Sequence, residues 1–245
     1  MRSRFTASFA TCYFTRMFTN QPRRGFLKSA GAGVVLLGCA HGSHSDSPHE
    51  GGDKDDNVTP AEDLMREHGI LRRVMYLYDD AARRLDEHHE LPVDALAAGA
   101  ALIRRVIEDY HEKLEEEFLF PRFEKAGKLV ELVTTLRKQH VVGRTLTDQI
   151  TALSKGKLAD SDRATLASAL RRFNHMYRPH AAREDTVLFP ALRGLVGAKA
   201  YGELGEQFEH KETQMLGEHG FEHAVDEVAR LEQAFGLDDL TKLTA

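Results

Sequence analysis

Two short stretches of the chain place the same metal-ligating residue types at the same spacing. His111 is followed by Glu115, His180 is followed by Glu184, and a Leu-Phe-Pro triplet ends each stretch. Residues four apart on a helix share one face, with Cβ atoms about 5–6 Å apart. Each pair could therefore aim an imidazole and a carboxylate at one point. A carboxylate has two oxygens, so each glutamate could also bridge two metal ions.

Two further histidines extend this pattern into a repeat. His68 precedes His111 by 43 residues, and His140 precedes His180 by 40 residues. The chain thus contains two similar segments, each with a lone histidine followed by His-x-x-x-Glu. Together they supply the ligands of a dinuclear, pseudo-twofold metal centre: His68, His111, Glu115, His140, His180 and Glu184.

A metal-free interpretation of these residues is less economical. A single histidine on an apolar face is more often a hydrogen-bonded core residue than a ligand. Four imidazoles and two carboxylates in one core would cost several kcal/mol for each uncompensated charge, so a cation is favoured. Nitrogen and oxygen ligands favour iron, with manganese second, whereas zinc usually takes fewer ligands.

Cysteine usage excludes several other kinds of site. The chain has two cysteines, Cys12 and Cys39, and both precede the predicted domain. Zinc fingers built on cysteine, iron–sulfur clusters and thiol nucleophiles are therefore excluded within that domain.

The elements that must position these residues are predicted to be helices. Four stretches carry apolar residues at steps of three and four, which is typical of bundle helices: residues 60–85, 92–121, 129–153 and 166–190. Short connections favour antiparallel neighbours. We expect an all-α, up-down-up-down four-helix bundle over residues 60–190. One additional C-terminal helix, at about 203–235 within residues 191–245, should pack on it.

The order of these motifs resembles that of the hemerythrin-like, or HHE cation-binding, family. The resemblance covers residues 60 to about 190 and implies a non-haem di-iron centre, with an oxo or hydroxo bridge, held by the six residues named above. Oxygen-carrying members have another histidine where Arg144 stands, and an aspartate where Asp185 stands beside Glu184. Reversible oxygen carriage is therefore disfavoured. Family branches linked to iron-centre repair, to nitric oxide or peroxide handling, and to iron or oxygen sensing fit better.

Several residues could act around the metals. Loss of the fifth histidine could open a coordination position, or Arg144 could pair structurally with Glu115 or Glu184. Three tyrosines could hydrogen-bond a bridging oxygen, or serve only in packing: Tyr76, Tyr110 and Tyr177. His219 and His223, four residues apart, are weaker candidates for a second metal site.

The expected ligand is a small molecule, namely dioxygen, nitric oxide or peroxide. A role in oxidative or nitrosative stress or in iron homeostasis would follow. The alternative is a non-catalytic oxygen or iron sensor or store. No catalytic residue or redox partner can be named from the sequence, and the choice between a binding protein and an enzyme stays open, with the binding protein preferred. An enzyme of this kind would be a di-iron oxidoreductase acting on peroxide or nitric oxide.

The first 38 residues are typical of an export signal. Arg23 and Arg24 precede an apolar stretch, residues 30–38, which is shorter than the roughly 20 residues that span a bilayer. This resembles a twin-arginine signal, and Leu-Leu-Gly-Cys39 resembles a lipobox. We expect a flexible tether over residues 39–59 and an exported protein on the periplasmic side. Its only membrane contact would be a lipid on Cys39.

The charge balance argues against nucleic acid as a partner. The chain has 33 basic and 38 acidic residues, for a net charge of −5. Six basic and no acidic residues fall within the first 38 positions, so the rest of the chain is more acidic still. Binding to a phosphate backbone needs clustered Lys and Arg.

Overall fold

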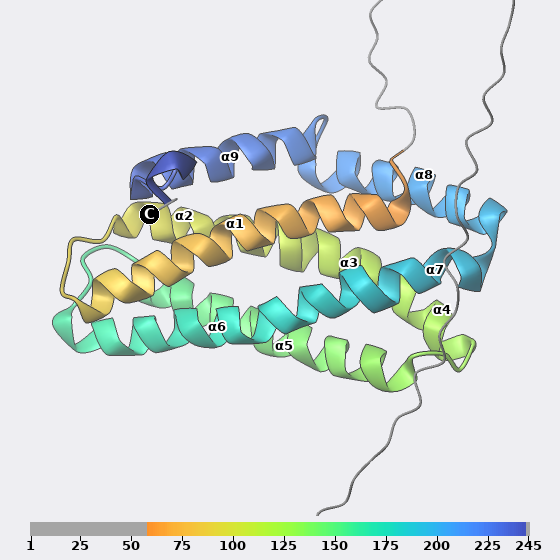
Figure 1. Cartoon of the computed structure of the whole chain (residues 1–245), viewed down its shortest axis with the longest axis horizontal. Coiled ribbons are helices and arrows are strands. Elements are labelled where there is room, and N and C mark those ends of the chain that lie inside the picture. Colours follow the sequence, from red (N-terminus) through yellow and green to blue (C-terminus); the bar gives the residue numbers. More distant parts are fainter. Residues whose placement is uncertain (1–57, 244–245) are drawn as a thin grey trace, which may run out of the picture. The chain divides into compact units, whose positions relative to one another are not determined.

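The computed structural model of the chain describes residues 58–243 and confirms the all-α class. The predicted signal segment, Cys39 and most of the predicted tether lie outside the described residues. Among the described residues, no helix is both long enough and apolar enough to cross a membrane. Figure 1 shows the bundle helices lying along the long axis, with successive helices running in opposite directions.

The first bundle helix is α1, Pro60–Asp86, and it begins where the sequence predicts. Thr59 is its N-cap, because its hydroxyl accepts a hydrogen bond from the Glu62 amide, and Pro60 occupies the first turn. A proline is tolerated there because the first amides of a helix have no intrahelical partner.

The second bundle helix is a succession of five segments. It consists of α2 (Val93–Leu102), a π-helical segment (Ile103–His111), α3 (Glu112–Leu114), a second π-helical segment (Glu115–Leu119) and α4 (Phe120–Lys125).

The prediction that this helix ends at Pro121 is wrong. The wide π-helical turn before it shifts the hydrogen-bond register, so Pro121 stands in the first turn of a new segment. Its missing N–H is not needed at that position.

The other half of the bundle follows the same plan. The third bundle helix is α5, Val130–Leu153. A short 3-10 turn, Asp160–Asp162, leads into α6 (Arg163–Arg183), a π-helical segment (Glu184–Leu188) and α7 (Phe189–Val196), which form the fourth bundle helix. Here too the helix continues past its proline, Pro190, for the same reason.

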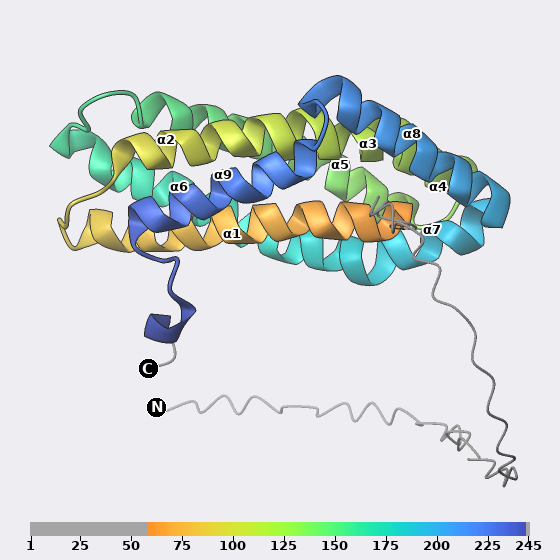
Figure 2. The same ribbon diagram turned by 90° about the horizontal axis from the view of Figure 1, so that it is seen from above.

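The C-terminal region holds two helices where one was expected. They are α8 (Ala198–Leu216) and α9 (Gly220–Phe235), and a 3-10 turn follows at Leu240–Leu243. The single helix predicted over 203–235 is broken because Gly217 and His219 adopt positive φ angles of 87° and 58°. α9 packs against α1 and α2, and Figure 2 shows it lying between them. α8 packs against α7 and α1.

The apolar interior of the bundle is divided into two clusters. One cluster includes Leu71 of α1 and Leu170 of α6, and the other includes Leu64 of α1 and Leu188 of the fourth bundle helix. On each bundle helix the predicted ligands lie between residues of the two clusters. A polar layer therefore crosses the middle of an otherwise apolar core.

Candidate metal centre

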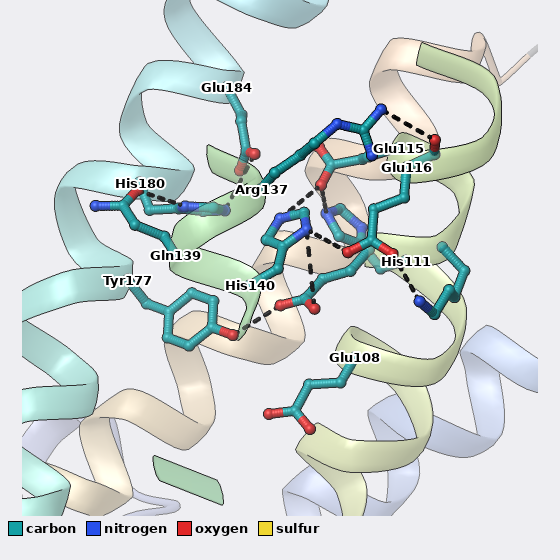
Figure 3. Close-up of polar contacts among 12 residues, drawn as sticks. Glu108, His111, Glu115, Glu116, Arg137, Gln139, His140, Tyr177, His180 and Glu184 are labelled. Atoms are coloured by element: carbon teal, nitrogen blue, oxygen red, sulfur yellow. Dashed lines mark hydrogen bonds and ion pairs between the residues drawn. The ribbon is translucent and has the colours of Figure 1, made fainter. Parts of the chain in front are cut away.

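The four bundle helices bring the six predicted ligands into one buried layer. α1 supplies His68, the second bundle helix His111 and Glu115, α5 His140, and the fourth bundle helix His180 and Glu184. Every one of these residues is at most 3% exposed. Figure 3 shows five of them, from three of the bundle helices, converging on one point.

The Nε2 atoms of all four imidazoles face the two carboxylates. Nε2 of His140 lies 3.3 Å from a Glu115 oxygen, and Nε2 of His111 lies 3.9 Å from the same oxygen. Nε2 of His68 lies 3.4 Å from one Glu184 oxygen, and Nε2 of His180 lies 3.1 Å from the other. Each carboxylate thus faces one imidazole from each half of the chain.

The imidazoles form two pairs, which we name half-sites. The first half-site is His68 and His111, with ring centroids 4.6 Å apart, and the second is His140 and His180, with centroids 5.1 Å apart. Ligand atoms of Glu184 lie within 4.8 Å of those of both half-sites. This arrangement has the geometry of two adjacent cation positions that share a carboxylate.

The atoms at this point lack the partners that buried polar atoms normally have. Nε2 of His111, Nε2 of His140 and all four oxygens of Glu115 and Glu184 are buried and make no hydrogen bond among the described residues. Leaving such atoms unsatisfied costs about 1–3 kcal/mol each. Lone pairs converging on one point are what a metal ion requires, so the residues fit a cation.

The outer face of each imidazole is held by an oxygen acceptor. Nδ1 of His111 lies 2.5 Å from Glu67, and Nδ1 of His140 lies 3.0 Å from Glu116. The two remaining Nδ1 contacts are with Gln139, 2.9 Å from His180, and Asp185, 2.7 Å from His68. An Nδ1–H that donates outward leaves the Nε2 lone pair pointing inward, as metal-bound histidines need.

These four acceptors form a closed ring around the bundle. Each lies on one bundle helix and holds the imidazole of the next helix in chain order, and Asp185 on the fourth helix returns to His68 on the first. Sequence reasoning missed this ring. The available signal is that every acceptor is directly adjacent in the chain to an inward-facing ligand.

The two halves of the centre are related by the sequence repeat. Glu116 and Asp185 each stand five residues after a ligand histidine, and Glu67 and Gln139 each directly precede a lone histidine. The phenylalanines of the two Leu-Phe-Pro triplets are also equivalent in the repeat, because each stacks on a lone histidine. Phe120 stacks on His140 and Phe189 stacks on His68, at centroid distances of 5.5 Å.

Without a cation, the charges of the centre are unevenly distributed. Burial and the neighbouring Glu184 raise the pKa of Glu115 well above its ordinary value. Burial is outweighed at Glu184 by the facing imidazoles, which lower its pKa. Burial also opposes a charge on His68, but Asp185 and Glu184 raise the pKa of His68 to about 9. The pKa of His140 falls to about 4 by burial. Metal binding would displace the protons held here.

Arg144 lies beside the centre but not in it. It forms ion pairs with Glu112 at 2.7 Å and with Glu116 at 2.8 Å, rather than with Glu115 or Glu184 as the structural alternative supposed. Because Glu116 accepts from Nδ1 of His140, Arg144 supports that ligand indirectly.

The three tyrosines take different positions. The Tyr177 hydroxyl donates to Glu112 at 2.7 Å, and the Tyr177 ring lies 5.4 Å from that of His180. Tyr110 is buried, and burial and the nearby Glu67 raise its pKa. The expectation for Tyr76 is wrong, because its side chain is 39% exposed at the surface.

The two weaker candidates for metal ligands, His219 and His223, do not cluster with other possible ligands among the described residues. His219 and His223 belong to none of the His/Cys/Asp/Glu groups with metal-binding spacing found within residues 58–243. A third such group, Glu112, Glu116 and His140, is one that Arg144 already neutralises.

Comparisons with known proteins agree with the geometry. The model of the hemerythrin HHE cation-binding domain matches residues 59–192 and again residues 133–234. Proteins of Mycobacterium tuberculosis and Mycobacterium bovis, both named only as uncharacterized, are 41% identical over 227 residues, covering 89% of this chain and 88% of each relative. No solved structure matches the chain significantly. The chain belongs to the family of hemerythrin HHE cation-binding domains.

Proposed function

We propose that this protein is an exported, non-haem di-iron protein that binds or reacts with a small ligand: dioxygen, nitric oxide or peroxide. The observation that carries the proposal is the convergence of four imidazoles and two carboxylates on a point where six of their buried ligand atoms make no hydrogen bond within the described part of the chain. The ligand set is His68, His111, Glu115, His140, His180 and Glu184. Bound iron would supply open coordination positions and one-electron exchange.

The residues of the chain have distinct roles in this proposal. Glu115 and Glu184 each face both half-sites, and therefore suit bridging positions. The outer acceptors keep each Nε2 lone pair directed inward. Phe120 and Phe189 cover the rings of the lone histidines and exclude water from them.

The burial of the six ligands supports the proposal that the molecule which reaches them is small. Two surface cavities, of about 840 and 330 Å³, lie along α6, and none of the six ligands lines either of them. A molecule of two to four atoms, such as dioxygen, nitric oxide or hydrogen peroxide, is of a size that fluctuations of the side chains would admit. We propose a role in oxidative or nitrosative stress or in iron homeostasis. The same enclosure favours the alternative, a non-catalytic oxygen or iron sensor or store.

The first test is metal content and absorption of the chain from residue 40 onward, purified with and without oxygen beside a His180→Ala control. Two irons per chain, with an oxygen-sensitive near-ultraviolet band that the control lacks, are expected. No iron, or iron retained in the control, contradicts the di-iron assignment. Repeated turnover of peroxide or nitric oxide, against one stoichiometric binding event, then separates an enzyme from a sensor or store.

The proposed location rests on the N-terminal sequence. A twin-arginine route carries folded proteins, which lets the metal be inserted before export. Replacement of both Arg23 and Arg24 by Lys should abolish export. Cys39→Ala should instead release the exported protein from the membrane fraction. Unchanged export in the first variant contradicts the twin-arginine assignment.

A further inference from the structure

In the ring of outer acceptors, one position that is charged in the first half of the repeat is neutral in the second half. In the repeat, Gln139 stands where Glu67 stands in the other half. Glu67 holds Nδ1 of His111 with a carboxylate at 2.5 Å, whereas Gln139 holds Nδ1 of His180 with an amide oxygen at 2.9 Å. The other repeat-related pair, Asp185 and Glu116, keeps a carboxylate in both halves.

The remaining acceptors increase this difference. Glu116, which serves the second half-site, is shared with two cations, Lys113 at 2.6 Å and Arg144 at 2.8 Å. Asp185, which serves the first half-site, pairs with Arg72. Glu112 also lies 3.9 Å from Nδ1 of His140, but Arg144 pairs with it at 2.7 Å. The first half-site is therefore surrounded by more negative charge than the second.

Charge on an outer acceptor is transmitted to the metal through the imidazole. A carboxylate that accepts Nδ1–H makes the ring a stronger donor, and such partners change metal affinity about 10- to 100-fold. A neutral amide has a weaker effect.

We infer that the two metal positions are inequivalent, and that Gln139 is the positioning residue that sets the difference. The first half-site, His68 and His111, takes up the first metal ion and retains it more tightly. The second half-site, His140 and His180, is the position from which metal is lost and at which the lower oxidation state is favoured. This inference rests on the proposed di-iron function.

The test is an anaerobic titration of the metal-free protein with Fe²⁺ in competition with a chelator. Gln139→Glu restores the carboxylate of the repeat and should tighten the weaker binding step about tenfold, leaving the stronger step unchanged. Gln149→Glu is the matched control, because it adds the same charge to α5 about 15 Å further along the helix. It should change both steps by less than about twofold. Glu67→Gln should weaken the stronger step.

The positions are assigned by anomalous diffraction from crystals that hold one equivalent of Fe²⁺. We expect the iron peak mainly between His68 and His111 in the natural chain, and equal peaks in Gln139→Glu. Equal occupancy in the natural chain, or a Gln139→Glu variant that behaves like Gln149→Glu, overturns the inference alone. A chain that binds no Fe²⁺ overturns the proposed function, and the inference with it.

Discussion

Nδ1 of His111 lies 2.5 Å from Oε2 of Glu67, the residue that directly precedes His68. A side chain beside one ligand therefore orients a ligand on a different helix. The same relationship holds between Gln139 and His180. Because every bundle helix both supplies and receives such a contact, the orientation of each ligand depends on the packing of the neighbouring helix.

Removal of an inner carboxylate should make the metal-free protein more stable and should lower the amount of iron that the protein binds. Glu115 is fully buried, and neither of its oxygens has a hydrogen-bond partner among the described residues. Glu115→Met should stabilise the metal-free protein by about 1–3 kcal/mol, since an apolar side chain replaces an unpaired polar group. Iron content should fall from two per chain to one or fewer.

Urea unfolding after chelator treatment, together with metal analysis, checks this prediction. Glu117→Met, on the exposed side of the same helix, is the control and should retain full iron. A Glu115→Met protein with two irons would show that this carboxylate is not a ligand.

Gly143 is required by the close approach of Tyr177. A Cβ atom added at Gly143 would lie 2.0 Å from the Tyr177 hydroxyl oxygen and 2.6 Å from Cζ. Gly143→Ala should therefore displace the ring, break its hydrogen bond to Glu112 and destabilise the fold by about 1–3 kcal/mol, as overpacking does.

A second glycine provides the comparison. Gly69 of α1 has no atom within 4 Å of an added Cβ, so Gly69→Ala should stabilise the protein by about 0.5–1 kcal/mol. Thermal or urea unfolding of both variants measures the two effects. Equal stabilities for the two alanine variants would contradict the role given to Gly143.

Arg144 compensates a buried carboxylate. Glu112 is 1% exposed and lies 2.7 Å from the guanidinium. At pH 9, where Glu112 is ionised beside Arg144, Arg144→Met should destabilise the protein by about 3 kcal/mol, because loss of one partner leaves a buried charge unpaired. The double variant Arg144→Met, Glu112→Gln removes that charge and keeps an acceptor for Tyr177. It should regain most of the lost stability, and a double variant as unstable as Arg144→Met would refute the pairing.

The metal-free protein should lose stability as the pH rises from about 6.5 to 9. Burial raises the pKa of Glu67 and of Glu112 from 4.5 to about 8, and carboxylate contacts raise the pKa of His68 to about 9 despite burial. In this window the folded chain binds more protons at these groups than the unfolded chain does. Stability therefore falls with pH. The pKa of His140 is shifted in the opposite direction, to about 4, and this shift changes the stability only below pH 6.5.

Urea midpoints of the chelator-treated protein at pH 6.5 and 9 provide the measurement. Metal affinity should change in the reverse sense, because ligation needs deprotonated groups. A midpoint that rises with pH in the metal-free protein would show that these groups do not hold the expected protons.

The sequence by itself predicts the helices and the inward-facing residues, because both depend on local periodicity. The steps of three and four that identify α1 also place His68 on its buried face, and the repeat of His-x-x-x-Glu identifies the other half of the centre. The family match confirms the bundle and its cation-binding character. The export segment and the lipid on Cys39 stay predictions.

Only the tertiary structure decided which residues surround the ligands. Glu67 and Gln139 look like ordinary polar neighbours in the chain, and their contacts appear only when the helices pack at a particular rotation and register. One of the two alternatives for Arg144, pairing with Glu115 or Glu184, is wrong for the same reason. The break between α8 and α9, and the continuation of helices past Pro121 and Pro190, depend on backbone conformations that side-chain periodicity does not encode. Local pattern determines which face of a helix is buried, whereas contacts between helices depend on the geometry of the whole bundle.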